Sequence, residues 1–239
     1  MQMVYSATLT EDIEIHVKTT FFVIRHGETD WNLNGRWQGH ADVPLNQVGR
    51  VQARRLADRL LRDGARIDAI YSSDLKRAWE TARAVAAALD LAPRLDPSLR
   101  EIDVGSWSGL TSTEVLARDT DTYERIKSGE DVARGGGERF LDLYTRVVAA
   151  AERLAAEQAG RTLAVVTHGG PVRALILHAA RDMAGVKAQS LHIGNTSITV
   201  LTHGQDGWQL GRINDMSHLE ASPQAPDMMS APPDDTERP

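Results

Sequence analysis

Two histidines stand at points where apolar segments of the chain stop, and each is followed directly by glycine. The run 21–24 leads into Arg25 and His26, and the run 162–167 leads into His168. A neutral imidazole has a nitrogen lone pair that can act as a nucleophile, and glycine lets the backbone come close to a bound group. His168 also precedes a predicted helix, whose first N–H groups lack partners and favour an anion. The two segments therefore predict the two halves of a phosphate-binding pocket.

Apolar patterns along the chain predict the elements that position these histidines. Apolar and β-branched runs predict strands, whereas apolar residues at helical spacing predict helices. The predicted elements are a strand at 21–24, a helix around 53–60, a strand at 67–71, a helix over 75–89 closed by Pro93, a short helix at 111–118, a helix over 140–155, a strand at 162–167, a helix around 172–180, and a hairpin of strands 197–201 and 208–213. This order predicts a three-layer α/β/α fold with a mainly parallel central sheet and an antiparallel edge. Ligands in such folds bind beyond the carboxyl ends of the strands, where both histidines fall.

The length of the chain, 239 residues, fits one domain with tails. We expect a loosely attached N-terminal extension over 1–18, the main domain over 19–219, and a disordered C-terminal tail over 220–239. That tail holds five of the nine prolines and has no periodic apolar face. The polar, glycine-rich stretch that follows 111–118 has no assigned element.

The composition excludes several kinds of chemistry. The chain has no cysteine, so disulfides, thiolate nucleophiles and cysteine-ligated metals are excluded, and a reducing compartment is compatible. The formal net charge of -6 gives no overall attraction for nucleic acid or anionic lipid, so an anionic substrate needs a local basic cluster. The start of the chain does not resemble a secretory signal, and no apolar run reaches membrane-spanning length. We therefore expect a cytoplasmic protein without nucleic-acid or membrane partners, and we predict neither a metal nor a cofactor because the remaining histidines lack metal-binding spacing.

The segment from Arg25 to Asn32 reads RHGETDWN and resembles the signature of the histidine phosphatase superfamily, also called phosphoglycerate mutase-like. Further segments are similar to that family in the same order, and the resemblance covers roughly residues 20–215. They are Gly35–Gly39, Asp42–Leu45, Ser72–Ala78, Leu99–Ile102 with Gly105–Gly109, and Thr167–Gly170. A lone arginine-histidine-glycine is a weak signal, whereas ordered matches at predicted strand ends and loops are specific. The resemblance implies the family's fold, phosphoryl transfer through histidine, and a small phosphorylated metabolite as substrate.

The resemblance also implies a role for five residues. His26 is similar to the family's nucleophile, which forms a phosphohistidine, and Glu101 is similar to its proton donor. His168 corresponds to the second catalytic histidine, which donates a hydrogen bond to the phosphoryl oxygens. Arg25 and Arg77 resemble the paired guanidiniums that fork onto phosphate oxygens, a geometry that lysine does not reproduce. An anionic phosphate beside a carboxyl favours the protonated form, as proton donation requires.

Other residues are expected to contact the phosphate or the substrate. Besides Arg25, Arg77 and His168, the resemblance implies such contacts for Asn32, Gln38, Gly39 and Gly169. A turn or helix-cap role remains open for Asn32, and tight-turn geometry explains Gly39 equally well. Glu138, which follows three glycines, resembles the family's glycine-glutamate step and is expected in the first turn of a helix.

Three functions remain open from the sequence. Phosphoglycerate mutases of the family usually carry an added segment between the acid and the second histidine, whereas Glu101 and His168 are 67 positions apart. The sequence Glu-Ile-Asp at 101–103 also departs from the mutases' usual glutamate-arginine-histidine. A non-catalytic phosphate-binding module would be expected to have lost one of the five catalytic residues, and all are present. The sequence therefore favours a phosphatase, with a 2,3-bisphosphoglycerate-dependent phosphoglycerate mutase as the alternative, and it predicts neither the physiological substrate nor the oligomeric state.

Overall fold

A computed structural model describes residues 17–180 and 191–219 of the chain. The predicted N-terminal extension, 1–18, lies outside the described residues except for its last two, and the predicted C-terminal tail, 220–239, lies wholly outside them. The domain boundaries at 19 and 219 therefore stay a prediction.

Six strands form one sheet in the order β3-β2-β4-β1-β5-β6. They are β1 (Thr19–Arg25), β2 (Ala69–Ser72), β3 (Pro93–Leu95), β4 (Thr162–Thr167), β5 (Ile198–Gly204) and β6 (Gly207–Leu210). Strands β3, β2, β4 and β1 run parallel, whereas β5 pairs antiparallel with β1, and β6 pairs antiparallel with β5. The prediction of a mainly parallel sheet with an antiparallel hairpin at its edge is confirmed.

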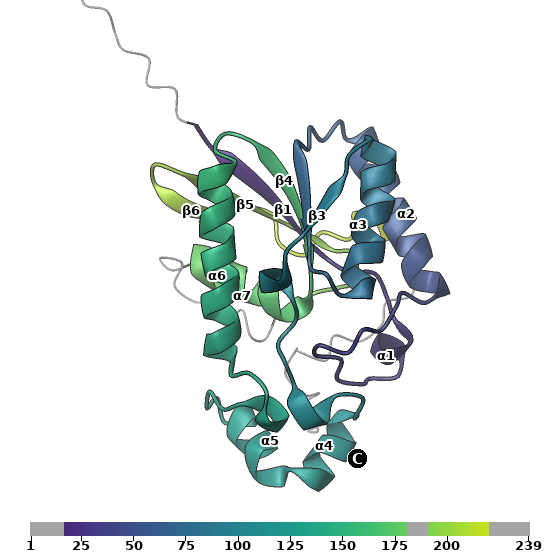
Figure 1. Ribbon diagram of the computed structural model, residues 1–239, viewed down its shortest axis with the longest axis vertical. Helices are drawn as coiled ribbons and strands as arrows, with labels where there is room; N and C mark the ends of the chain where they lie inside the picture. The colour runs from purple at the N-terminus through teal and green to yellow at the C-terminus, as the bar shows by residue number, and fades with distance from the viewer. Residues whose placement is uncertain (1–16, 181–190, 220–239) are drawn as a thin grey trace, which may run out of the picture.

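Helices cover both faces of this sheet (Figure 1). Helices α6 (Phe140–Glu157) and α7 (Gly169–Ala179) pack on one face, and α2 (Gln47–Arg62) and α3 (Lys76–Leu89) pack on the other. Three short helices, α1 (Asp30–Leu33), α4 (Ser112–Arg118) and α5 (Thr120–Lys127), lie beyond one end of the sheet. Single turns of 3₁₀ helix occur at η1 (Pro97–Leu99), η2 (Gly105–Trp107), η3 (Arg134–Gly136) and η5 (Ser217–Leu219). The three-layer α/β/α fold class is thereby confirmed.

Side chains of the central strands alternate between two apolar cores. Phe21 and Val23 of β1 pack into the core that contains Leu154 of α6, whereas Ile24 packs into the core that contains Leu56 of α2. All five side chains are almost completely buried. Because both faces of β1 are covered, its sequence is a continuous apolar run rather than an alternation of apolar and polar residues.

The structure differs from the sequence patterns at three places. Strand β3 begins at Pro93, for which the pattern predicts only a helix stop. The preceding helix, α3, ends at Leu89 and is followed by the C-cap residue Asp90, which has a left-handed φ of 54°. Proline is tolerated at the first residue of an edge strand. Helix α5 and the turn at Arg134–Gly136 occupy the stretch without an assigned element, and α7 begins at Gly169 rather than near Val172.

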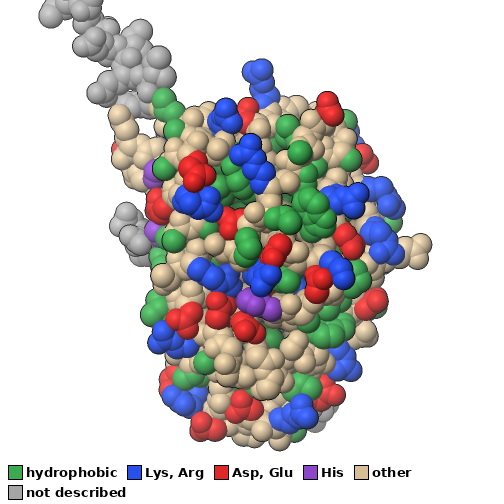
Figure 2. Space-filling model, viewed as in Figure 1, with side chains coloured by type: hydrophobic (Ala, Val, Ile, Leu, Met, Phe, Trp, Pro, Cys, Tyr) green, Lys and Arg blue, Asp and Glu red, His purple; other side chains and the backbone are tan. Residues whose placement is uncertain are grey.

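Within the described residues, no helix has both the length and the apolar character needed to cross a membrane. On the face shown in Figure 2, basic and acidic side chains are interspersed. A cytoplasmic location stays a prediction.

Candidate active site

Three neighbouring parallel strands end side by side and bring three polar side chains together. Arg25 of β1 pairs with Thr167 of β4, so His26 and His168 leave the sheet at the same level. Their imidazole rings lie 5.1 Å apart between centroids, in an edge-to-face arrangement. Ser73 follows β2, which also pairs with β4, and therefore emerges beside His168. The register of the sheet thus joins the two segments that the sequence predicts to form the pocket.

Backbone contacts fix which nitrogen of His26 carries the proton. Nδ1 lies 2.6 Å from the carbonyl oxygen of Gly27, and because a carbonyl oxygen only accepts, Nδ1 is the donor. The carbonyl oxygen of His26 accepts from the side-chain amide of Asn195 at 3.0 Å and from the backbone N–H of Thr196 at 3.2 Å. In the neutral ring the lone pair then lies on Nε2. This tautomer is the one that nucleophilic attack through Nε2 requires.

Burial and two arginines keep His26 in its neutral form. Only 3% of the residue is exposed. Burial, followed by the positive charges of Arg77 and Arg25, holds the pKa of His26 well below its usual range, although the hydrogen bond to Gly27 opposes this. The pKa of His168 is lowered by burial first and then by the charge of Arg77. Both imidazoles are therefore neutral at pH 7.

The lowered pKa values predict how the histidines and the fold respond to acid. We expect His26 and His168 of the phosphate-free protein to remain neutral as the pH falls through about 6.5, near which both titrate in the unfolded chain, because their folded pKa values are lowered well below it. The unfolded chain then binds protons that the folded protein does not, so the free energy of unfolding falls as the pH drops below about 6.5. Imidazole ¹⁵N NMR and urea denaturation at several pH values check both effects. Titration near 6.5 in the folded protein would contradict this electrostatic account.

Arg77 ties several loops of the pocket together. The fully buried side chain donates from Nε to Nδ1 of His168 at 3.1 Å, from Nη1 to the carbonyl oxygen of Ala41 at 2.7 Å, and from Nη2 to that of Gly39 at 2.8 Å. A guanidinium has five N–H groups, so one on each Nη remains for a ligand. Burial lowers the pKa of Arg77 to about 10, and the group stays charged at neutral pH.

His168 holds the opposite tautomer from His26. Because Arg77 only donates, Nδ1 of His168 accepts its bond, and the ring proton sits on Nε2, which lies 2.8 Å from Oγ of Ser73. Donation to a phosphoryl oxygen, as the resemblance implies, would require this proton to turn from Ser73 to the ligand. Sequence reasoning did not select Ser73, although it lies inside the matched segment that ends with Ala78.

The carboxylate of Glu101 lies against the start of α7. Its Oε1 accepts from the backbone N–H of Ile102 at 2.8 Å, and its Oε2 accepts from that of Gly170 at 3.2 Å. A Cβ at Gly170 would come within 2.3 Å of Oε1, so a side chain there would displace the carboxyl group of Glu101. The carboxyl group is therefore held next to the residues that directly follow His168.

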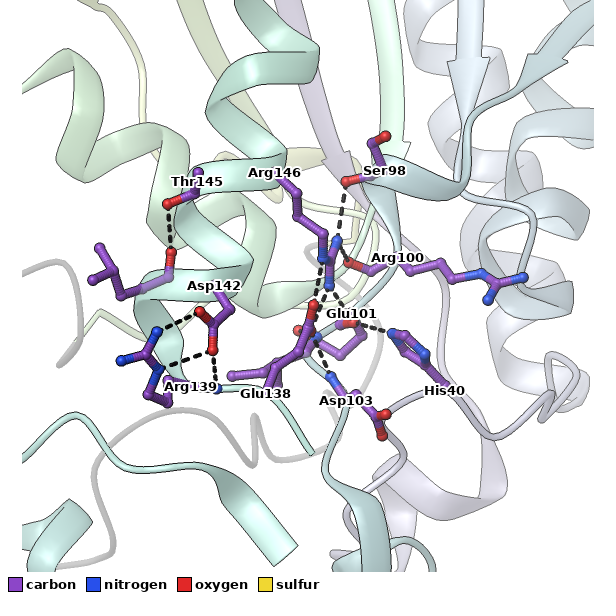
Figure 3. A network of polar contacts seen from close by, with 12 residues as sticks. His40, Ser98, Arg100, Glu101, Asp103, Glu138, Arg139, Asp142, Thr145 and Arg146 are labelled. Atoms are coloured by element: carbon purple, nitrogen blue, oxygen red, sulfur yellow. Dashed lines mark hydrogen bonds and ion pairs between the residues drawn. The ribbon is translucent and has the colours of Figure 1, made fainter. Parts of the chain in front are cut away.

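A polar network holds the backbone of the segment that carries Glu101 (Figure 3). Arg146 of α6 donates to the carbonyl oxygens of Arg100 and Glu101, both at 2.7 Å. Arg146 also pairs with Glu138 at 2.8 Å, and Glu138 accepts from the backbone N–H of Asp103 at 2.9 Å. The expectation that Glu138 lies in the first turn of a helix is wrong, because it stands two residues before α6, where it helps to clamp the Glu101 segment.

The remaining predicted contact residues lie around the same loops. Asn32 is the third residue of α1, and its Oδ1 accepts from the backbone N–H and the hydroxyl of Thr29 in a capping box. A ligand contact from Asn32 would therefore come through Nδ2, and it stays a prediction. Gln38 is buried, and its Oε1 has no hydrogen-bond partner among the described residues. Gly39 has the left-handed φ of 51° that a tight turn needs, and Gly169 is the first residue of α7.

The segment before β5 also contributes to the site, and no sequence pattern points to it. Nη1 of Arg25 donates to the carbonyl oxygen of Ile193, while Asn195 and Thr196 bind the carbonyl oxygen of His26. Thr196 has a φ of 57°, which is unusual for a β-branched residue and is typical of strained functional loops. This segment fixes the backbone on the side of His26 away from β4.

The arrangement of these side chains is typical of enzymes that transfer phosphoryl groups. Beyond the carboxyl ends of parallel strands, a neutral imidazole with its lone pair on Nε2 lies within electrostatic range of two guanidiniums, and a carboxyl group lies at the residues that follow His168. This combination suits phosphoryl transfer, which needs a nucleophile, positioned cations and a proton for the leaving oxygen. Within 17–180 and 191–219, no three histidine, aspartate or glutamate side chains are arranged to hold a metal ion.

Known proteins have a similar fold and a related sequence. The family model described as histidine phosphatase superfamily (branch 1) matches residues 21–216. The chain is 41% identical over 202 residues to phosphoglycerate mutase-like protein 4 of Arabidopsis thaliana, covering 83% of this chain and 86% of the relative. It is 35% identical over 216 residues to a metal-independent phosphoserine phosphatase of the same plant, covering 89% and 88%. A mutant phosphoserine phosphatase of Entamoeba histolytica, solved in complex with phosphoserine, aligns with a TM-score of 0.74 and 30% identity over 84% of this chain and 99% of that one. The chain belongs to the histidine phosphatase superfamily.

Proposed function

We propose that the protein is a phosphatase that hydrolyses small phosphomonoesters through a phosphohistidine on His26. One observation carries the proposal: Nδ1 of His26 is committed to the carbonyl oxygen of Gly27, which leaves the Nε2 lone pair in a pocket with the charged Arg77. The family and the phosphoserine phosphatases among its relatives support hydrolysis of phosphoric monoesters.

In the first half of the proposed reaction, Nε2 of His26 attacks phosphorus, and the bond from phosphorus to the ester oxygen breaks. Glu101 gives its proton to that oxygen, so that a neutral alcohol leaves. Arg25 and Arg77 offset the charge on the equatorial oxygens of the transition state. His168 adds a hydrogen bond from Nε2 once its proton turns from Ser73.

In the second half, a water molecule attacks phosphorus of the phosphohistidine. Glu101 is now ionised and takes the proton of the water. The bond between phosphorus and Nε2 of His26 breaks, its electron pair returns to the ring, and inorganic phosphate leaves. The carboxyl group is protonated again at the end of the cycle, so Glu101 serves as acid and base in turn.

Turnover of p-nitrophenyl phosphate with excess EDTA tests the proposal. We expect release of p-nitrophenol and inorganic phosphate that the chelator does not diminish, because every catalytic group in the proposed reaction is a side chain of the protein. Folded protein that shows no turnover between about pH 5 and 8 would contradict the proposal and favour a non-catalytic phosphate-binding module.

A panel of phosphorylated metabolites, ranked by kcat/KM, extends the same experiment to the choice between phosphatase and mutase. The mutase assay follows interconversion of phosphoglycerates with 2,3-bisphosphoglycerate present. The mutase is retained as the alternative because one Arabidopsis relative is named phosphoglycerate mutase-like protein 4. We expect hydrolysis to exceed interconversion, because only 67 positions separate Glu101 from His168. Interconversion that exceeds hydrolysis would contradict this expectation.

A further inference from the structure

Arg134 is a buried arginine that the proposed reaction does not use. It lies at the start of η3, and 9% of the residue is exposed. Within residues 17–180 and 191–219, neither Nε nor Nη1 of its guanidinium has a hydrogen-bond partner. Burial lowers the pKa of Arg134, whereas the charges of Asp131 and Glu101 raise it, so the group lies within electrostatic range of the candidate proton donor. A buried cation with unpaired donors costs free energy, and such groups are concentrated at binding sites.

The backbone holds Arg134 firmly against the segment that carries Glu101. The next residue, Gly135, has a φ of 55°, and a Cβ there would come within 2.4 Å of the carbonyl oxygen of Val104. A Cβ at Gly137 would come equally close to the carbonyl oxygen of Asp103. Only glycine fits at these two contacts, so the loop and the Glu101 segment form one packed unit. A site built on such a rigid support can place a charged group accurately.

The two neighbouring carboxylates already have other partners. Oδ1 and Oδ2 of Asp131 accept from the backbone N–H groups of Phe140 and Leu141 at the start of α6. The oxygens of Glu101 accept from backbone N–H groups of its own segment and of α7. Each carboxylate is thus held by backbone N–H groups, and among the described residues Nε and Nη1 of Arg134 form no hydrogen bond with either of them, so these two donors stay available for a ligand.

We propose that Arg134 binds a carboxylate of the substrate, so that the preferred substrates are phosphomonoesters with a carboxylate close to the ester oxygen. This inference rests on the proposed function. The position beside Glu101 is the relevant one, since Glu101 serves the ester oxygen and the alcohol part of the substrate must extend past it. Arginine pairs with a carboxylate through two parallel hydrogen bonds, which gives both affinity and orientation.

Charge balance favours a carboxylate over a second phosphate. Arg134 supplies one positive charge, and both Glu101 and Asp131 carry carboxyl groups within electrostatic range of it. A carboxylate brings one negative charge, whereas a second phosphate brings nearly two and would be repelled more strongly by these neighbours.

Matched substrate pairs test the proposal. One pair is 3-phosphoglycerate and glycerol 3-phosphate, and the other is O-phosphoserine and O-phosphoethanolamine; within each pair one compound lacks the carboxylate. We expect Arg134→Met to lower kcat/KM roughly 10- to 100-fold for the carboxylated compounds and less than about 3-fold for their partners and for p-nitrophenyl phosphate. Arg134→Lys keeps the charge and loses the fork, so it is expected to fall between Arg134→Met and the wild type. The matched control is Arg118→Met, which removes an exposed arginine of α4.

Three results would overturn the inference. They are equal losses within each pair, absence of a preference for carboxylated esters in the wild-type protein, and a selective loss for fructose 1,6-bisphosphate over fructose 6-phosphate without one for 3-phosphoglycerate. Titration calorimetry of the first pair into His26→Ala, with and without Arg134→Met, measures the same discrimination in binding alone. The inference also fails if 3-phosphoglycerate and glycerol 3-phosphate bind equally well to His26→Ala that retains Arg134. Failure of the proposed function is distinguishable, because the wild-type protein would not turn over p-nitrophenyl phosphate at all.

Discussion

Replacing His26 by alanine is expected to lower kcat for p-nitrophenyl phosphate by roughly 10⁴-fold or more. The substitution removes the only group proposed to form a bond to phosphorus, and the oxygen-binding arginines cannot replace it. Arg77 reaches the pocket through bonds to His168, Ala41 and Gly39. Those bonds do not involve His26, so phosphate binding is expected to persist in the inactive variant.

The matched control is His203→Ala, which removes a partly exposed histidine of β5. We expect this variant to keep wild-type kcat. Steady-state assays and calorimetric titration with inorganic phosphate measure turnover and binding on the same samples. Undiminished turnover by His26→Ala would rule out His26 as the nucleophile, and loss of fold would appear in the circular dichroism spectrum.

Glu101→Gln is expected to separate substrates by their leaving group. An alkoxide needs a proton as it leaves, whereas p-nitrophenolate hardly does, so kcat/KM should fall roughly 10²- to 10⁴-fold for glycerol 3-phosphate and less than about 10-fold for p-nitrophenyl phosphate. Both values report the steps up to formation of phosphohistidine. The later hydrolysis also needs Glu101 as base, so a burst of p-nitrophenol followed by slow turnover is expected.

Glu114→Gln serves as the control, because it makes the same chemical change at an exposed helix cap of α4. Glutamine at 101 keeps one oxygen to accept from the backbone at Ile102 or Gly170, and kcat/KM for p-nitrophenyl phosphate shows whether the pocket survives. Equal losses for both substrates would count against Glu101 as the acid.

The histidines of the pocket were predictable because of how parallel sheets are built. Strands buried on both faces are continuous apolar runs, so His26 and His168 stand out where β1 and β4 end. Parallel pairing then brings strand ends to one edge without any further information. The fold class and the neighbourhood of the two histidines follow from the same pattern.

Short elements with few buried residues were not predictable. Helix α5 is short, has no fully buried residue, and places only Tyr123 and Ile126 partly against the core, which is too little to reveal a helix. Strand β3 has three residues at the sheet edge and starts with proline, which reads as a stop. In both cases the local sequence is compatible with a loop, and only tertiary packing decides.

Contacts between segments that lie far apart in the sequence were also not predictable. Ser73 meets His168 across two strand ends, and Thr196 reaches the carbonyl oxygen of His26 from the far end of the chain. Arg134 lies in a polar, glycine-rich stretch where exposure is the ordinary expectation, yet it is buried within electrostatic range of Glu101. Asn32 shows the converse, because the helix-cap alternative describes its side-chain oxygen in the structure.

Rapid quenching of the wild-type reaction shows whether His26 carries the phosphoryl group during turnover. Enzyme is mixed with p-nitrophenyl phosphate, quenched in alkali, digested with trypsin and analysed by mass spectrometry. Cleavage after Arg25 releases the peptide 26–36, in which His26 is the only histidine. We expect one phosphoryl group on the peptide 26–36, and this group is expected to be stable in alkali and lost in acid. We expect none on the peptide 162–173, which contains His168. Phosphate on the His168 peptide, or none on either peptide during turnover, would contradict this expectation.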